Sequence, residues 1–124
     1  MRVVTDAEKT AIAHDWVAAW NQHDLDAIMA HYAADIEFQA STVVSRWNRP
    51  NGILHGVREL REQFARGLEI APNLHFTIEA VYHSPDGYAV CYVRENGNRA
   101  IDAVELDGRG AAIRVHAYYL SAQP

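Results

Sequence analysis

The order and spacing of apolar residues predict an α+β fold, in which a curved, mostly antiparallel sheet is wrapped by three N-terminal helices. Apolar residues recur at helical spacing as far as Pro72, and they alternate with polar residues after it. Turn signals separate the alternating segments, so consecutive strands are expected to pair as a meander. A sheet curved in this way leaves a cone with a central pocket that suits a small molecule.

The first helix is expected over residues 6–20. Thr5 is followed three residues later by Glu8, which is the pattern of a capping box. Trp16 and Trp20 recur at helical spacing and are expected on the face that meets the sheet. Aromatic stripes of this kind usually belong to a core, but buried indole N–H groups need partners that a polar ligand can supply.

A second, shorter helix is expected to begin after Asp24 and to carry Tyr32. Residues 36–39 then alternate as a short strand, with Ile36 and Phe38 on one face. We expect these two apolar residues to face the cone. The alternative, with the polar residues of this strand inside, would bring a second carboxylate into the pocket.

Residues 40–55 are the least regular stretch and are predicted to form a long loop with apolar anchors. Such loops commonly act as lids or pocket walls. Trp47 is one of the anchors, and Arg46 and Arg49 flank it, where they would guard the mouth of the cone. His55 stands at the end of the loop, so it is a candidate for the pocket lining.

A third helix is expected from Gly56 to Pro72, and four strands follow it. Their turns are marked by Ser-Pro-Asp-Gly, by Asn96-Gly97 and by Asp-Gly-Arg-Gly. The Asn-Gly pair is the strongest of these hairpin signals. The expected strands cover residues 74–82, 88–95, 99–106 and 111–120.

Length and composition indicate one domain over residues 1–124 and exclude several classes of function. The 11 Lys and Arg residues against 16 Asp and Glu residues give a charge of −5, which argues against nucleic-acid binding. No apolar run is long enough for a membrane span, and the N-terminus has no apolar signal core, so we predict a cytoplasmic protein without a membrane partner. Seven histidines and one cysteine show no metal-ligand spacing, so neither a metal nor another cofactor is expected.

Three motifs resemble the nuclear-transport-factor-2-like superfamily. The sequence WVAAWNQHDLDAIMAHYAAD over residues 16–35 resembles its two-helix opening, most closely that of the SnoaL-like polyketide cyclases and the ketosteroid isomerases. LHGVREL over residues 54–60 is similar to its helix entry, and residues 101–110 with Tyr118-Tyr119 resemble its last hairpin. The resemblance covers nearly the whole chain. It implies the cone fold, a small-molecule pocket and a homodimer formed through the outer sheet face.

The resemblance does not carry isomerase activity over to this chain. Ketosteroid isomerases use a tyrosine as their first oxyanion donor at the position where this chain has Trp16. They place a general-base aspartate where this chain has Ala40. Their second oxyanion donor, a protonated aspartate, matches Asp102 in the pair Ile101-Asp102. One of three positions is therefore kept.

Asp102 is the candidate catalytic residue. It shares a strand face with Ala100 and Val104, and a carboxyl group on an apolar concave wall has its pKa raised by desolvation. Such a group can act as an acid or a base near neutral pH. The alternatives are that this face is solvent-exposed, or that Asp102 is the structural partner of an arginine.

The register across the Asn96-Gly97 turn places Cys91 and Val93 on the same face as Asp102, and Arg94 and Arg99 on the outer face. The predicted outer face carries Tyr92, Ile101, Tyr118 and Leu120, a mixture that suits a dimer interface. The predicted pocket-lining residues are Trp16, Trp20, Tyr32, Trp47, His55, Cys91, Val93, Val104 and Tyr119.

Three functions of different class are compatible with the sequence. The first is a cofactor-independent isomerase, cyclase or lyase that uses a pocket carboxylate on an apolar cyclic or polyketide-like substrate. The alternative is a non-catalytic small-ligand-binding or accessory domain, and a protein-interaction module is third. Titratable groups converging on Asp102 would favour the enzyme, whereas an apolar cone with Asp102 paired to an arginine would favour the binding domain.

Overall fold

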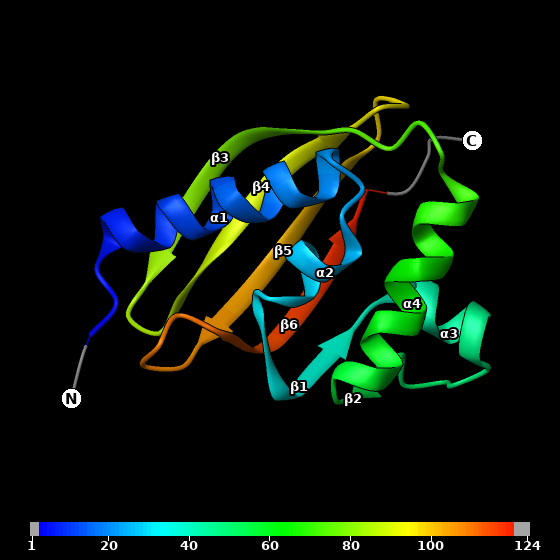
Figure 1. The fold of residues 1–124 in the computed structure, drawn as a ribbon, viewed down its shortest axis with the longest axis horizontal. Coiled ribbons are helices and arrows are strands. Elements are labelled where there is room, and N and C mark those ends of the chain that lie inside the picture. Colours follow the sequence, from blue (N-terminus) through cyan, green and yellow to red (C-terminus); the bar gives the residue numbers. More distant parts are fainter. Residues whose placement is uncertain (1–2, 121–124) are drawn as a thin grey trace.

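The computed structural model describes residues 3–120, and within them helices pack on one face of a six-stranded sheet (Figure 1). The first half of the chain contains α1 (Asp6–Asn21), α2 (Leu25–Met29), β1 (Tyr32–Gln39), α3 (Ser41–Trp47), β2 (Ile53–His55) and α4 (Val57–Ile70). The second half contains β3 (Phe76–Ser84), β4 (Gly87–Arg94), β5 (Arg99–Leu106) and β6 (Ala112–Tyr119). The α+β fold predicted from the sequence is confirmed.

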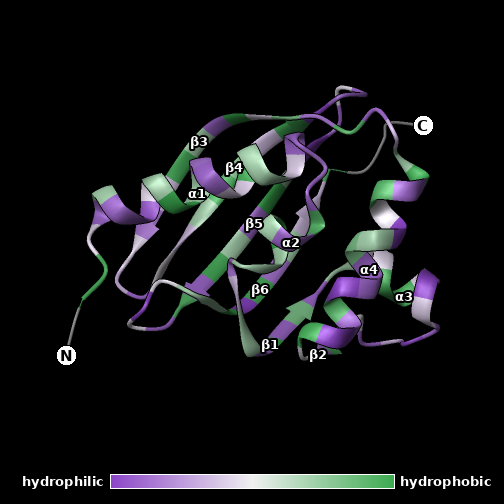
Figure 2. Cartoon of the chain, in the orientation of Figure 1, coloured by the Kyte–Doolittle hydropathy of each residue, from purple (hydrophilic) through white to green (hydrophobic). Residues whose placement is uncertain are grey.

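The sheet has the order β2-β1-β6-β5-β4-β3 and curves around the helices. Neighbouring strands are antiparallel except for β1 and β6, which run parallel. Register shifts interrupt the pairing between Ile78 and Ala80 and between Glu105 and Leu106. Such bulges bend a strand and increase its twist, which helps the sheet to curve. Figure 2 shows both hydrophobic and hydrophilic residues along β5, and its first four residues, Arg99 to Asp102, alternate between exposed and buried.

α1 begins at the predicted capping box and crosses β3 and β4. The Thr5 hydroxyl oxygen accepts a hydrogen bond from the Glu8 backbone N–H at 3.1 Å, and the Glu8 side chain accepts one from the Thr5 N–H at 3.0 Å. The helix buries Trp16 and Trp20 against the sheet, where both rings contact Phe76. This contact fixes one wall of the interior space.

Two segments differ from the sequence-based expectation. Tyr32 does not extend the second helix but opens β1, because the adjoining carbonyl of His31 accepts a hydrogen bond from the Ala112 N–H and so starts the ladder with β6. The predicted loop at 40–55 contains α3 and β2, which pairs with β1. The apolar anchors Val43 and Leu54 are the buried residues of that helix and that strand.

The register across the β4–β5 hairpin also differs, by one residue. The turn closes through Arg94 and Asn98, leaving three residues in the loop, with Gly97 at a φ of 83°. A two-residue turn centred on Asn96-Gly97 would have paired Cys91 with Asp102, whereas the observed partner of Asp102 is Val90. The expectation that Cys91 and Val93 share the inner face was therefore wrong. Tyr92 and Arg94 take that face instead.

Gly87 is expected to be intolerant of any side chain, because it begins β4 against the β5 backbone. A Cβ there would overlap the carbonyl of Val104, lying 2.8 Å from its carbon. Gly87→Ala should lower the free energy of unfolding by about 3 kcal/mol or more, because the backbones must separate. Urea denaturation measures the loss. Gly67→Ala is the control, since its nearest neighbour would be Arg46 Nη1 at 3.8 Å, and it should be neutral or slightly stabilising. Equal stability of the two variants would contradict this packing.

Candidate active site

A cavity of about 110 Å³ lies between the concave face of the sheet and helices α1, α3 and α4. Much of its wall is aromatic: the rings of Trp20 and Phe64 meet edge to face at 4.9 Å, and those of Phe76 and Tyr92 lie 4.5 Å apart. The full lining is Trp16, Trp20, Phe38, Thr42, Arg46, Gln63, Phe64, Gly67, Ile70, Ala71, Leu74, Phe76, Tyr92, Arg94, Asp102 and Tyr119.

Asp102 is the acidic residue of this wall. Its side chain is 5% exposed, and the Tyr92 hydroxyl donates a hydrogen bond to its Oδ1 at 3.1 Å. Burial raises the pKa of Asp102 from 3.8 to about 7, while the hydrogen bond from Tyr92 acts in the opposite direction. Asp102 can therefore take up or release a proton near neutral pH.

Phenol groups converge on Asp102. Burial raises the pKa of Tyr32, Tyr88, Tyr92 and Tyr119, and the negative charge of Asp102 adds to the shift of each. All four are therefore neutral hydroxyl groups at physiological pH. Tyr32 is oriented by Trp16, whose Nε1–H donates to the Tyr32 oxygen at 2.8 Å.

Asp102 and Trp16 also border a second, smaller space of about 10 Å³, whose lining also includes residues of β1, β4 and β6. Tyr32 and Val104 line this space rather than the main cavity. His31 lies there as well, and burial lowers its pKa, which favours the neutral imidazole. A tyrosine and a neutral histidine thus lie on the far side of Asp102 from the main cavity.

Trp47 lies behind the cavity wall rather than in it. Its Nε1–H donates to Gln63 Oε1 at 3.0 Å, and Gln63 Nε2 donates to the Thr42 hydroxyl at 2.9 Å. Its ring lies beneath the guanidinium groups of Arg49 and Arg66, at 5.0 and 5.2 Å. Trp47 therefore positions Gln63, which lines the cavity in its place.

His55 lies outside the cavity, on an exposed groove that also contains Arg49 and Glu59. Arg49 makes a two-pronged ion pair with Glu59 at 2.8 and 2.6 Å, and the His55 backbone N–H donates to Glu59 at 3.0 Å. These hydrogen bonds lower the pKa of Glu59 to about 2. The strand β2 carries His55 to the sheet edge, so the expectation that its side chain lines the pocket was wrong.

The cavity thus brings together four of the residues predicted for the site, Trp16, Trp20, Asp102 and Tyr119. It also contains Phe38, which was expected to face the cone. Sequence reasoning missed Phe64, Phe76, Tyr92 and Arg94 as lining residues. The correct hairpin register would have revealed the last two, because they share the inner face of β4 with Val90. In β6 the structure places Tyr119 in the cavity and Tyr118 on the outer face, as the sequence predicts, and Val115 is 1% exposed on the inner face.

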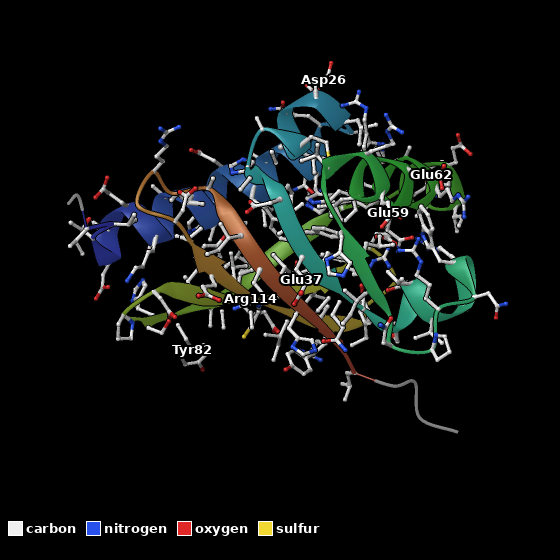
Figure 3. All side chains as sticks on the ribbon, turned by 90° about the horizontal axis from the view of Figure 1, so that it is seen from below. Asp26, Glu37, Glu59, Glu62, Tyr82 and Arg114 are labelled. Atoms are coloured by element: carbon white, nitrogen blue, oxygen red, sulfur yellow. The ribbon has the colours of Figure 1, made fainter. Side chains whose placement is uncertain are left out.

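Several ionic contacts lie away from this cavity. On the outer sheet face Arg114 contacts Glu37 at 3.4 Å and Glu105 at 2.6 Å, and Figure 3 shows Glu37 and Arg114 close to one another. Within residues 3–120, no group of three or more histidine, cysteine or acidic residues is arranged to hold a metal ion. No helix in that range is long and apolar enough to cross a membrane.

Comparison with known proteins identifies the family. A sequence profile described as the SnoaL-like domain matches residues 13–120. The chain belongs to the SnoaL-like family. A SnoaL-like protein of unknown function from Burkholderia thailandensis has a similar structure, with a TM-score of 0.91 and 28% identity, over 97% of this chain and 100% of that one. No curated protein sequence matches this SnoaL-like chain.

More distant structures share the fold of this SnoaL-like protein. A nuclear-transport-factor-2-like protein of unknown function from Cytophaga hutchinsonii has a TM-score of 0.68 at 13% identity, covering 94% of this chain and 90% of that one. AclR from Streptomyces galilaeus, provisionally described as a hydroxylase, has a TM-score of 0.73 at 17% identity, covering 94% of this chain and 77% of that one. At these identities the likeness concerns the fold alone.

Proposed function

We propose that this SnoaL-like protein is a cofactor-free acid/base enzyme of the isomerase or cyclase type, with Asp102 as its proton-transfer group. The observation that carries the proposal is a buried carboxyl group on the wall of an aromatic cavity, hydrogen-bonded to the phenol of Tyr92. Within the described residues no arginine contacts this carboxyl group. That arrangement favours an acid/base role over a structural ion pair.

The size of the cavity limits the part of the substrate that it can enclose. An engineered protein cavity of about 150 Å³ binds benzene, and the cavity here measures about 110 Å³. The enclosed part of the substrate is therefore about one small ring, with further groups extending through the mouth. A one-ring or short polyketide-like molecule fits this description better than a four-ring steroid.

The chemistry follows from the protonation of Asp102. As a carboxylate it takes a proton from a carbon next to a carbonyl group, and as a carboxylic acid it returns the proton to the same carbon or to another one. The enolate oxygen formed in between needs a hydrogen-bond donor. Trp20 lines the cavity, and its buried Nε1–H has no hydrogen-bond partner among the described residues, so it can supply this bond if the ring shifts toward the ligand.

Proton exchange into a simple ketone tests the proposal. The probe is cyclohex-2-enone in D₂O, with deuterium incorporation next to the carbonyl followed by NMR. The native protein should accelerate the exchange, and Asp102→Asn should reduce the acceleration by about 10² or more, because the amide cannot accept the proton. Asp35→Asn, at an exposed carboxylate on β1, is the control and should exchange at the native rate. Equal rates for Asp102→Asn and the native protein would contradict the proposal.

A non-catalytic binding protein is the second candidate. It is favoured by the absence of a second carboxylate or a histidine from the lining of the main cavity within the described residues. In that case small cyclic ketones would bind without exchange, and Asp102→Asn would alter neither affinity nor rate. The exchange experiment above therefore separates the two candidates.

We also propose a cytoplasmic homodimer formed through the outer face of the sheet. This face exposes Ile101 (40%), Tyr118 (52%) and Tyr82 (65%), and Leu120 (62%) follows β6. Tyr92, expected on this face, is buried on the other one, so the apolar area is smaller than predicted. Light scattering at micromolar concentration should give about twice 13.9 kDa. Tyr118→Lys should shift the mass to that of the monomer, and a monomeric native protein would refute this assembly.

A further inference from the structure

Two arginines from different elements line the cavity at some distance from Asp102. Arg46 comes from α3 and Arg94 from the inner face of β4. Arg46 lies against α4, where a Cβ at Gly67 would be 3.8 Å from its Nη1. Arg94 lies over the ring of Phe76, with its guanidinium carbon 5.8 Å from the ring centre. Two positive charges therefore border one end of an aromatic cavity.

Neither arginine is hydrogen-bonded to a carboxylate among the described residues. Arg46 makes no ion pair there, and Arg94 makes only a long ion pair with Glu95, in which Nε lies 3.7 Å from Oε1. The buried Arg94 Nε has no hydrogen-bond partner. By contrast, Arg49, Arg61 and Arg66 each contact a carboxylate oxygen within 3.0 Å. A buried donor of this kind is costly unless a ligand satisfies it.

Arg94 ends β4, four residues beyond Val90, which is the register partner of Asp102, so its charge is displaced along the strand from the carboxyl group. Tyr119 interacts electrostatically with Arg46, Arg94 and Asp102, whereas neither arginine contributes to the shift in the pKa of Asp102. Burial lowers the pKa of Arg46, the charges of Arg94 and Arg66 add to this shift, and Tyr119 opposes it, so Arg46 and Arg94 repel one another. An anion between them would relieve the repulsion.

We propose that the ligand is a cyclic carboxylic acid, whose ring occupies the aromatic cavity and whose carboxylate binds between Arg46 and Arg94. The ring then lies between Trp20, Phe64 and Phe76, and its opposite end reaches Asp102 and Tyr92. This assignment rests on the proposed function in taking Asp102 as the reacting end. It adds a charge requirement that a purely apolar ligand would not meet.

Calorimetric titration with trans-cinnamate and its uncharged analogue trans-cinnamamide tests the assignment. The two probes share their ring and shape and differ in charge. Cinnamate should bind at least about tenfold more tightly than the amide, since hydrogen bonds to a charged group are the stronger ones. Raising NaCl from 20 to 200 mM should weaken the binding of cinnamate and leave the amide unchanged.

Arg46→Gln and Arg94→Gln should each reduce the preference for cinnamate about tenfold, with binding of the amide retained as evidence of an intact cavity. Arg109→Gln is the matched control, because Arg109 is exposed in the β5–β6 turn and makes no side-chain ion pair among the described residues. Thermal unfolding checks that each variant is folded.

Equal affinity for the two probes, a preference that survives both substitutions, or no binding of cinnamate at millimolar concentration would overturn the anion site. Each of these results leaves the proposed function standing if cyclohex-2-enone still exchanges in an Asp102-dependent manner. Loss of that exchange with the cinnamate preference intact would instead refute the proposed function and keep the anion site.

Discussion

Asp102→Asn is expected to stabilise the protein at pH 8 by up to about 4 kcal/mol. The pKa of this carboxyl group is raised from 3.8 to about 7 by burial, so folding takes up a proton between these two values. The stability that this proton confers is fully present below about pH 4 and is lost as the pH rises through 7. An amide cannot ionise and still accepts the hydrogen bond from Tyr92, so the variant avoids the loss.

Urea denaturation of both proteins between pH 5 and 8 measures this effect. The advantage of Asp102→Asn should grow with pH and level off above about 7. Asp35→Asn, which removes an exposed carboxylate, should show no such growth. An advantage that does not depend on pH would mean that the carboxyl group is not the source of the effect.

Phe64→Ala is expected to lower the free energy of unfolding by about 3–5 kcal/mol. Phe64 is 6% exposed, and its ring lies 4.9 Å from that of Trp20, 5.5 Å from that of Tyr32 and 5.4 Å from that of Phe38. Removing the ring eliminates these contacts and enlarges the cavity. Urea denaturation gives the loss, and Phe64→Leu, which fills most of the volume, should lose less than half as much.

The same substitution should alter ligand size preference if the protein still folds. A two-ring ketone such as 2-tetralone should gain affinity relative to cyclohex-2-enone, because the enlarged cavity can enclose the second ring. A loss of stability below about 1 kcal/mol, together with unchanged preference, would show that Phe64 is not part of the cavity wall.

Local signals predicted the elements well where one physical effect dominates. The Thr5–Glu8 capping box starts α1 where expected, and the strand at 99–106 coincides with β5. Alternation alone predicts that Asp102 shares a strand face with Ala100 and Val104, and the structure buries Asp102 on that face. These features depend on residues that are close together in the sequence, so a single sequence is enough to predict them.

Features that depend on partners distant in sequence were harder to predict. Tyr32 continues the helical spacing of α2, but it pairs with β6 and therefore belongs to β1. The Asn96-Gly97 pair fits both a two-residue turn and the observed three-residue loop, and the choice between them decides whether Cys91 or Tyr92 faces Asp102. Arg94 differs for the same reason. The two-residue turn predicts it on the outer face, whereas the observed register, shifted by one residue, places it in the cavity.

The most direct test of a buried acid/base group on the ligand cavity is an NMR titration of the Asp102 carboxyl carbon, assigned by its loss in Asp102→Asn. Its chemical shift should titrate with a midpoint near 7, the pKa to which burial raises it. Tyr92→Phe removes a hydrogen bond that lowers this pKa, so the midpoint should then move upward. A midpoint near 4 in the native protein, the value of an aspartate in water, would contradict the account.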